Sequence, residues 1–508
     1  MPPSGLEFLS MRCTPCPATV AALLAALLLT PAPLLAQRWD VGRSASGSVI
    51  TALARPGAPA GAPTVLLIGG LDDAADSAAR VRQAMRSADR PDVRLIVLAE
   101  GNPDGGPLAF PPQGTAYREN PESHALWRWI GVHAPDLVLV AGEDFGLATA
   151  LSAGSAAGVG AIPARRVTSD GALLDAIPAT VSPSPARLEI VRRQARTPSA
   201  VASELAGIYG HAFDQVTYLP GMALIGRMRL GEVSDVEALA ARHLATPPPI
   251  RSSLTIAGHL VFAELAERTG RADYLALARS AADLAFDDTG APLEAMPMHG
   301  EMSDAFFMAG PVLARTGRLT GDARYFDMVG RHVRFMNGLV LRPDGLYRHS
   351  PLTEAAWSRA NAFPALGMAL LLSDVPETHA VFPELLDSFR RHMVALVPFQ
   401  DADGMWHVVV DHPGSYAELS ATAMIGTAML RGIERGWLDP EVYRPVVDAA
   451  WSGVLARTAP DGTLVDVCES TNKQDSLEAY LNRAAILGQD ERGGGMMLMF
   501  ATEMAGLH

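Results

Sequence analysis

The second half of this sequence is a series of amphipathic helical segments, and this series constrains the fold more than any other feature. Apolar residues recur there at spacings of three and four, and Gly, Pro and Asp interrupt the pattern between segments. Twelve helices are predicted, over residues 199–213, 219–232, 233–246, 254–270, 272–287, 302–318, 322–338, 361–375, 379–396, 414–436, 438–457 and 490–507.

Two of the turns between these segments repeat one phrase. Residues 267–270 read Glu-Arg-Thr-Gly and precede Tyr274, and residues 314–317 read Ala-Arg-Thr-Gly and precede Tyr325. A helix, a glycine turn and a second helix form an antiparallel hairpin. Six such hairpins predict a closed, all-α (α/α)6 barrel over residues 196–508. An open superhelical solenoid is the alternative, and the total of twelve helices favours closure.

The first part of the chain follows a different pattern. Short β-rich apolar runs at 64–68, 93–99 and 137–140 alternate with helical stretches at 74–87 and 123–133. Strands that alternate with helices predict an α/β domain with a mainly parallel sheet. This domain is expected over residues 37–195. The segment 182–198 is rich in Ser, Pro and Arg and contains the predicted boundary.

The N-terminus has the features of a secretory signal peptide. Arg12 precedes an apolar run at 18–29, and two prolines and the small residue Ala36 follow it. We expect residues 1–36 to be removed and the protein to be exported, to the periplasm. The remaining chain has one cysteine, Cys468, which cannot form an internal disulfide. No later stretch is long and apolar enough to span a bilayer, so no membrane association is expected after cleavage.

The charge of the chain excludes one class of partner. The formal net charge is -14, and the sequence contains no cluster of Lys and Arg. Nucleic acid is therefore not an expected partner, because binding it relies on neutralising phosphates. An anionic substrate would need a few local cations. The sequence does not indicate an oligomeric state.

Three segments of the predicted barrel carry more polar and aromatic residues than packing requires. They are His299–Asp304, a stretch from Asp344 to Phe363, and a stretch from Met405 to Glu418. In an (α/α)6 barrel, the ends of the inner helices and the loops above them line a central pocket. We therefore expect these three segments to meet there.

These segments resemble the unsaturated rhamnogalacturonyl and glucuronyl hydrolases. The barrels of that family carry a Trp-x-Arg-Gly-x-Gly-Trp signature. Its counterpart here contains Trp357, Arg359, Ala360, Asn361, Ala362 and Phe363, with alanines in place of the glycines and Phe363 in place of the last Trp. The run Ser415-Tyr416-Ala417-Glu418-Leu419-Ser420 and the glycines at 493–495 are also similar to the family. The resemblance covers nearly all of the chain after Pro198.

The resemblance implies a glycoside hydrolase that releases unsaturated uronic acid from lyase-generated oligosaccharides. Lyases leave a C4=C5 double bond on the terminal uronic acid, and the family hydrates this bond. An Asp at the position of Asp304 is the general acid/base: one carboxyl group protonates C4 and activates water toward C5. This differs from the mechanism in which two carboxylates share the work.

The resemblance also implies which residues bind the substrate. Arg359 is expected to pair with the uronate carboxylate, because a guanidinium can bond both oxygens at once. Trp357 and Phe363 would stack on sugar faces. No metal or other cofactor is expected. The full set of expected substrate-binding residues is His349, Trp357, Arg359, Phe363, Tyr416 and Glu418.

Most of these residues also have a structural interpretation. Asp304 stands near a helix start, where Asp is a common cap or first-turn residue. Arg359 could form a surface salt bridge and Trp357 could anchor packing, while helix-terminal hydrogen bonds would equally explain Tyr416 and Glu418. The family further has a second acid ahead of the helix that begins near Leu254, where this sequence reads Arg-Ser-Ser-Leu-Thr. A catalytically silent glycan-binding protein is therefore the alternative function.

The N-terminal part resembles zinc carboxypeptidases in the motif Asn102-Pro103-Asp104-Gly105. The expected zinc ligands are missing, however. Asp72 stands at the first His position, Ala75 at the Glu position and Gly142 at the last His position. Because zinc catalysis needs about three protein ligands, we expect a degenerate domain used for scaffolding or glycan binding. An altered metal site built from Asp72, Asp73 and Asp76, with metallo-amidase activity, is the alternative.

Overall fold

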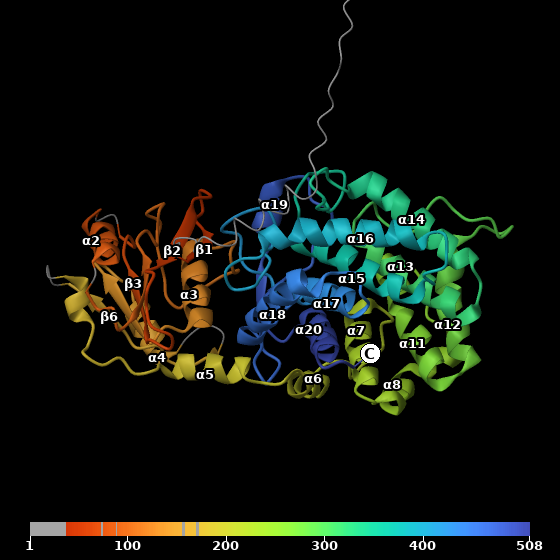
Figure 1. The fold of residues 1–508 in the computed structure, drawn as a ribbon, viewed down its shortest axis with the longest axis horizontal. Coiled ribbons are helices and arrows are strands. Elements are labelled where there is room, and N and C mark those ends of the chain that lie inside the picture. The colour runs from red at the N-terminus through yellow and green to blue at the C-terminus, as the bar shows by residue number, and fades with distance from the viewer. Residues whose placement is uncertain (1–36, 73–74, 88, 155–157, 169–171, 508) are drawn as a thin grey trace, which may run out of the picture.

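A computed structural model describes residues 37–507 except 73–74, 88, 155–157 and 169–171. The predicted signal peptide and Asp73 lie outside the described residues. The chain forms two bodies that lie side by side (Figure 1): an α/β domain and a larger helical domain. They are connected by two short helices at the edge of the molecule, α5 (Pro185–Gln194) and α6 (Pro198–Ala206).

A mixed six-stranded sheet forms the N-terminal domain. Its parallel part has the order β4-β3-β5-β6, and β1 and β2 extend the sheet antiparallel beside β4. The parallel strands include the three predicted runs, whereas the N-terminal hairpin was not predicted. The strands are β1 (Arg38–Arg43), β2 (Val49–Ala54), β3 (Thr64–Ile68), β4 (Arg94–Leu98), β5 (Leu137–Ala141) and β6 (Ala164–Val167).

Helices cover both faces of this sheet. Along β3, Leu66 and Ile68 face a core that includes residues of α3 (Pro121–His133), while Val65 and Leu67 face α2 (Ala75–Arg86). Both faces are therefore apolar, as expected for strands covered on two sides. The domain also contains α4 (Leu147–Ala153), and α5 packs against the same core as α3.

The helical domain is a closed ring of inner helices. Each inner position contacts the next, and the last, α20, contacts the first, α7. This closure excludes the open solenoid. The predicted helix 254–270 is broken at His259 into α10 and α11, which together fill one position of the ring. The inner helices are α7 (Tyr218–Arg229), α10 (Ser253–Gly258), α11 (Leu260–Thr269), α13 (Ala305–Thr320), α15 (Ser358–Asp374), α17 (Leu419–Glu434) and α20 (Glu491–Met504).

An outer layer of helices packs against this ring, so that the C-terminal domain is an (α/α)6 barrel, as predicted. Each of the twelve predicted helical ranges contains a helix of the structure. None of the described helices is long and apolar enough to cross a membrane. The outer helices are α6, α8 (Val233–Ala240) with the short α9 (Arg242–Ala245), α12 (Ala272–Ala282), α14 (Arg324–Val340), α16 (Phe382–Leu396) and α18 (Pro440–Ala456).

The two ends of the barrel differ in character. At one end, ion pairs connect the C-terminal turns of the inner helices: Glu503 pairs with Arg229 and Arg431, and Arg315 pairs with Glu264 and Asp374. The positive charges of these arginines interact favourably with the negative C-terminal ends of the helix dipoles. The N-terminal ends of the inner helices meet at the other end, where a short hairpin of β7 (Leu464–Cys468) and β8 (Ala485–Gly488) and the helix α19 (Leu477–Leu481) extend beside them.

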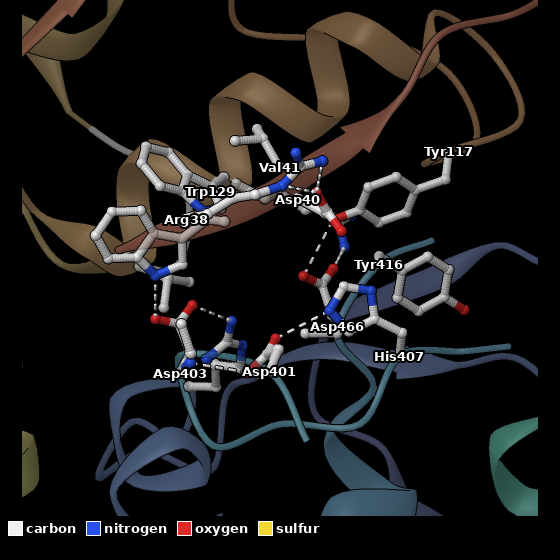
Figure 2. A pocket seen from close by; sticks show the side chains of 16 residues that line it. Arg38, Asp40, Val41, Tyr117, Trp129, Asp401, Asp403, His407, Tyr416 and Asp466 are labelled. Carbon is white, nitrogen blue, oxygen red and sulfur yellow. Dashed lines mark hydrogen bonds and ion pairs between the residues drawn. The ribbon is translucent and has the colours of Figure 1, made fainter. Parts of the chain in front are cut away.

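A cavity of about 190 Å³, open to solvent on one side, lies between the two domains. Figure 2 shows side chains of both domains around it, with Trp129 and Asp40 on one side and Asp401, Asp403 and His407 on the other. Its charged groups are largely matched by one another. Burial alone would raise the pKa of Asp403, but His133, Arg457 and the indole N–H of Trp39 hold it well below its usual value.

A first prediction concerns the contact between α13 and α15. A Cβ atom on Gly367 would lie 2.7 Å from the backbone carbonyl of Phe306. We expect Gly367→Ala to lower the free energy of unfolding by about 1–3 kcal/mol. Gly338, in the exposed part of α14, has no atom within 4 Å of such a Cβ, so Gly338→Ala should stabilise by about 0.5–1 kcal/mol. Urea denaturation measures both. Equal effects would mean that α13 and α15 do not approach through Gly367.

A second prediction concerns the pH dependence of stability. Burial opposes protonation of His407, but its hydrogen bond to Asp401 (2.9 Å) and the charges of Asp401 and Asp40 outweigh burial and raise its pKa. The stability from this pair is therefore fully present below the unfolded pKa of about 6.5 and is lost as pH rises through the folded pKa. The loss of unfolding free energy in His407→Gln should shrink as pH rises from about 6 to 9. A loss that does not depend on pH would contradict this assignment.

Candidate active site at the mouth of the barrel

Asp304 occupies the N-cap position of α13, but its carboxylate makes no capping hydrogen bond. Three other caps at this end of the barrel do: Ser252 on α10, Glu418 on α17 and Asp490 on α20 each accept a backbone N–H of their own helix. The interpretation of Asp304 as a helix cap is therefore wrong. Its side chain is 17% exposed, which leaves it accessible at the mouth of the barrel.

His349 lies directly beside Asp304. Its Nε2 is 3.3 Å from Oδ1 of Asp304, and its carbonyl accepts the N–H of Ser303. On the other side of the ring, Nδ1 is 2.8 Å from the hydroxyl of Tyr480, which accepts the N–H of Gln474. Because that backbone N–H occupies the oxygen as acceptor, the hydroxyl proton can be donated to Nδ1. Nε2 then carries the proton that faces Asp304.

Several polar atoms at this point are buried without a hydrogen-bond partner among the described residues. They include Oδ1 of Asp304, Nε2 of His349 and the hydroxyl of Ser303. The Asp304–His349 contact is close enough for an ion pair but lacks hydrogen-bond geometry. Buried polar groups are nearly always satisfied, so such a cluster needs an explanation. A polar ligand that binds beside Asp304 and His349 would provide it.

Trp357 and Arg359 continue the site from His349. The Trp357 ring lies 4.8 Å from the ring of His349, and the guanidinium of Arg359 lies over the same indole at 4.7 Å. Asn361 holds this segment in place: its amide donates to the carbonyls of Tyr347 and Trp357 and accepts the N–H of Tyr347. Four predicted residues, Asp304, His349, Trp357 and Arg359, are thus in consecutive contact.

The guanidinium of Arg359 is buried and has partners in the chain. It donates to the carbonyls of Cys468 (2.7 Å) and Glu469 (2.9 Å), and it lies 3.7 Å from the carboxylate of Glu418. Burial alone would lower its pKa, but nearby acidic groups raise it, so Arg359 stays cationic. The alternative interpretation of Arg359 as a surface residue with a salt bridge is wrong, because its side chain is buried. Its contact with a substrate carboxylate stays a prediction.

Glu418 and Tyr416 have clear structural tasks. Glu418 caps α17 and also accepts the N–H of Cys468 (2.9 Å), as the helix-terminal interpretation expected. Tyr416 lines the cavity between the domains, where it stacks on Tyr117 at 4.4 Å. Tyr416 therefore faces the N-terminal domain. Roles for either residue in binding substrate stay predictions.

Phe363 lies in the barrel core, where it contacts Phe307 and Tyr218. Burial raises the pKa of Tyr218, and the charges of Arg359 and Asp304 also act on it, so its hydroxyl lies within electrostatic reach of both. Phe363 is itself buried, with an exposed fraction of 1%. A stacking role for Phe363 is untested.

Sequence reasoning missed two features of this site. Tyr480 bonds His349 across 131 positions of sequence, and no local pattern marks it. Lys473, the only lysine of the chain, pairs with Glu301 (2.9 Å) and stands next to Gln474, which bonds Tyr480. The rarity of lysine is a signal that was present in the sequence. Lys473 places a cation close to the rim of the site.

In the N-terminal domain, the positions expected for zinc ligands have local structural roles instead. Asp72 accepts the hydroxyl of Ser77 and the N–H of Glu143, and Gly142 adopts a φ of +85° beside it. Asn102 and Gly105 close the expected turn. Among the described residues, no three His, Cys, Asp or Glu side chains are grouped to hold a metal ion. The resemblance to zinc carboxypeptidases stays a prediction.

The helical domain is similar to known proteins. A family model described as Glycosyl Hydrolase Family 88 matches residues 255–508, which is half of the chain. The unsaturated rhamnogalacturonyl hydrolase YesR of Bacillus subtilis is 30% identical over 186 residues, which are 35% of this chain and 52% of YesR. An unsaturated 3S-rhamnoglycuronyl hydrolase of Formosa agariphila is 29% identical over 179 residues, 31% of this chain and 47% of the relative. The chain thus spans about half the length of these curated relatives.

Solved structures share the barrel fold. A possible member of the GH105 family from Salmonella enterica superposes with a TM-score of 0.53 at 21% identity and covers 61% of this chain and 94% of its own. A glycosyl hydrolase family 88 protein from Bacteroides vulgatus gives 0.51 at 16% identity, covering 62% of this chain and 100% of its own. At these identities the likeness concerns the fold alone.

Proposed function

This chain belongs to Glycosyl Hydrolase Family 88, and we propose that it releases the unsaturated uronic acid from the end of lyase-generated oligosaccharides. The observation that carries the proposal is the pair of Asp304 and His349. It lies at the mouth of the barrel, with a carboxylate that caps no helix and buried polar atoms that lack partners. The names of the two relatives, both hydrolases of unsaturated sugars, support the same substrate class.

In the proposed reaction, Asp304 first donates its proton to C4 of the unsaturated sugar. A water molecule then bonds to C5 and gives its proton to the Asp304 carboxylate, which restores the acid. The net change is the addition of one water across the double bond. The hemiketal at C5 opens by breaking the bond between C5 and the ring oxygen. This leaves a hemiacetal at C1, whose collapse breaks the bond from C1 to the glycosidic oxygen and releases the neighbouring sugar. His349, held by Tyr480, keeps Asp304 oriented through both proton transfers.

The charge of the site suits an anionic sugar. The N-terminal ends of α13, α15 and α17 meet here, and each brings the positive end of a helix dipole. Arg359 and Lys473 add two cations. We propose that the positive charge of Arg359 attracts the uronate carboxylate inside the site. Lys473 adds a second positive charge at the rim.

One observation favours the alternative of a silent glycan-binding protein. At the position of the family's second acid, Ser252 forms a capping box with Thr255, so a helix cap has taken this place. Turnover separates the two functions. A wild-type protein that binds unsaturated disaccharides in calorimetry, but consumes none, would establish the alternative. The hypothesis of metallo-amidase activity in the N-terminal domain would instead require stoichiometric metal in the purified protein.

The first functional prediction is that Asp304→Asn removes turnover. Because the two side chains have nearly the same shape and Asp304 caps no helix, thermal stability should stay close to that of the wild type. Loss of general acid/base help should lower the rate by about 10²–10⁴-fold. The loss of absorbance of the unsaturated uronyl group measures the rate. Asp387→Asn, on the solvent side of the outer helix α16, is the matched control, and a wild-type rate in Asp304→Asn would remove Asp304 from the mechanism.

The second functional prediction separates the two cations. Arg359→Gln and Lys473→Gln each remove one charge, and each should raise KM for an unsaturated uronide about 10- to 100-fold, as expected for a lost charged partner. The methyl ester of the same substrate should be affected much less, because it has no full negative charge. If Arg359→Gln impairs acid and ester equally, Arg359 serves only to hold Cys468 and Glu469.

A further inference from the structure

The strand β7 is distorted next to the site. A bulge interrupts its pairing with β8 between Val465 and Val467, and the residue in the bulge, Asp466, has a φ of +65°. A left-handed conformation costs about 1–3 kcal/mol for a residue other than glycine. Bulges commonly re-aim a side chain. Here the bulge turns the carboxylate of Asp466 toward the N-terminal domain.

The N-terminal domain holds this carboxylate with two side chains. Arg128 of α3 pairs with Oδ1 in a buried ion pair, and the hydroxyl of Tyr117 donates to Oδ2 (3.1 Å). Arg128 also donates to the carbonyl of Ala485 in β8. Figure 2 shows Tyr117 and Asp466 approaching each other from the two domains. These contacts offset the strain at Asp466 and fix where the bulge occurs.

The position of the bulge sets the register of the residues that follow it. Two positions on, Cys468 offers its N–H to Glu418 and its carbonyl to Arg359, and the carbonyl of Glu469 receives the second bond of Arg359. A shift of β7 by one residue would point these backbone groups to the opposite edge of the strand. Arg359 would then lose both carbonyls, and it lies against Trp357, which contacts His349.

A second set of contacts reaches the loop after β7. Arg118 of the N-terminal domain pairs with Glu469 (2.9 Å), and Arg43 of β1 lies 3.5 Å from Glu478. Glu478 is two residues from Tyr480, which bonds His349. The loop that completes the site is thus held at both ends by the N-terminal domain.

We propose that the N-terminal domain is a positioning element of the hydrolase site, and that Tyr117 and Arg128 are its positioning residues. They hold Asp466, and through β7 they fix Arg359, Trp357 and His349 around Asp304 without touching the substrate. The expected change in kcat rests on the proposed function, because it can be measured only if the protein has the proposed activity. Its structural consequence, an ordered β7, does not depend on that function.

The kinetic test uses the full chain with Tyr117→Phe and Arg128→Gln. Both should lower kcat and narrow or shift its pH profile, because His349 and Asp304 are misaligned, and they should raise KM less than Arg359→Gln does, because the displaced Arg359 keeps its charge. A displacement of about 1 Å can cost up to about 100-fold, so we expect roughly 10- to 100-fold for Arg128→Gln and less for Tyr117→Phe. Arg128→Lys, which keeps the charge, should restore part of kcat.

A matched control removes an interdomain hydrogen bond elsewhere. Gln194 of α5 donates to the hydroxyl of Ser452 in α18 (3.0 Å), an exposed contact that involves neither β7 nor Asp466. Gln194→Ala should leave kcat and its pH profile unchanged. If it lowers kcat as Tyr117→Phe does, the domain interface acts only through general stability and the proposal fails.

The second readout does not need turnover. In a full chain that carries Cys13→Ser and Cys16→Ser, Cys468 is the only thiol, and it is buried. Its reaction with a thiol reagent should become at least about 10-fold faster in Tyr117→Phe and Arg128→Gln, because local opening of β7 exposes it. Gln194→Ala should react at the wild-type rate.

The two readouts separate the possible failures. A wild type without turnover on any unsaturated uronide overturns the proposed function, while the thiol rates still decide the inference. Should Arg128→Gln fail to fold, Tyr117→Phe, which keeps the ring stack on Tyr416, decides it alone. Wild-type thiol rates together with wild-type kcat in a folded Tyr117→Phe would overturn the positioning role.

Discussion

The closure of six inner helices into a ring is the constraint on which the rest of the structure depends. Closure brings the N-terminal ends of these helices to one end of the barrel, and every helix start carries backbone N–H groups without intrahelical partners. Ser252, Glu418 and Asp490 satisfy such groups with their side chains. Asp304 stands at the same kind of position but leaves its carboxylate unused for capping. The ring therefore brings the positive ends of the dipoles together at the mouth, and Asp304 stands there with a carboxylate that caps no helix.

The sequence predicts the barrel well because its signals are local. Apolar spacing and glycine turns act within one helix or one hairpin, and each predicted range contains a helix. The beginning of α15 is the informative error: it was predicted at Asn361 and lies at Ser358. Polar residues at the mouth interrupt the apolar pattern there. The pattern therefore does not indicate the first turn of α15. The hairpin of β1 and β2 had an alternating apolar signal, at Trp39, Val41, Ile50 and Ala52, that was overlooked.

The candidate site was predictable only in part, for the opposite reason. The order of Asp304, His349, Trp357 and Arg359 could be taken from the family signature. Their partners could not, because Arg359 bonds carbonyls 109 and 110 positions later and His349 bonds Tyr480 131 positions later. Backbone carbonyls have no sequence signal at all. The sequence does not show whether an arginine side chain is buried or exposed, because burial depends on the tertiary fold.

The loss of the family's second acid is easier to understand in this light. Hydration of a C4=C5 bond needs one group that donates a proton and then receives one, and a single carboxyl group can do both in turn. A second carboxylate near Asp304 would add negative charge where an anionic sugar must bind, against the dipoles of α13, α15 and α17. In this chain Ser252 replaces that charge with a neutral cap, and the remaining acids around Arg359 are committed to hydrogen bonds. Among the described residues, Asp304 thus stands at the mouth as a carboxylate that caps no helix, beside groups that favour an anion, and this arrangement suits the proposed one-acid mechanism.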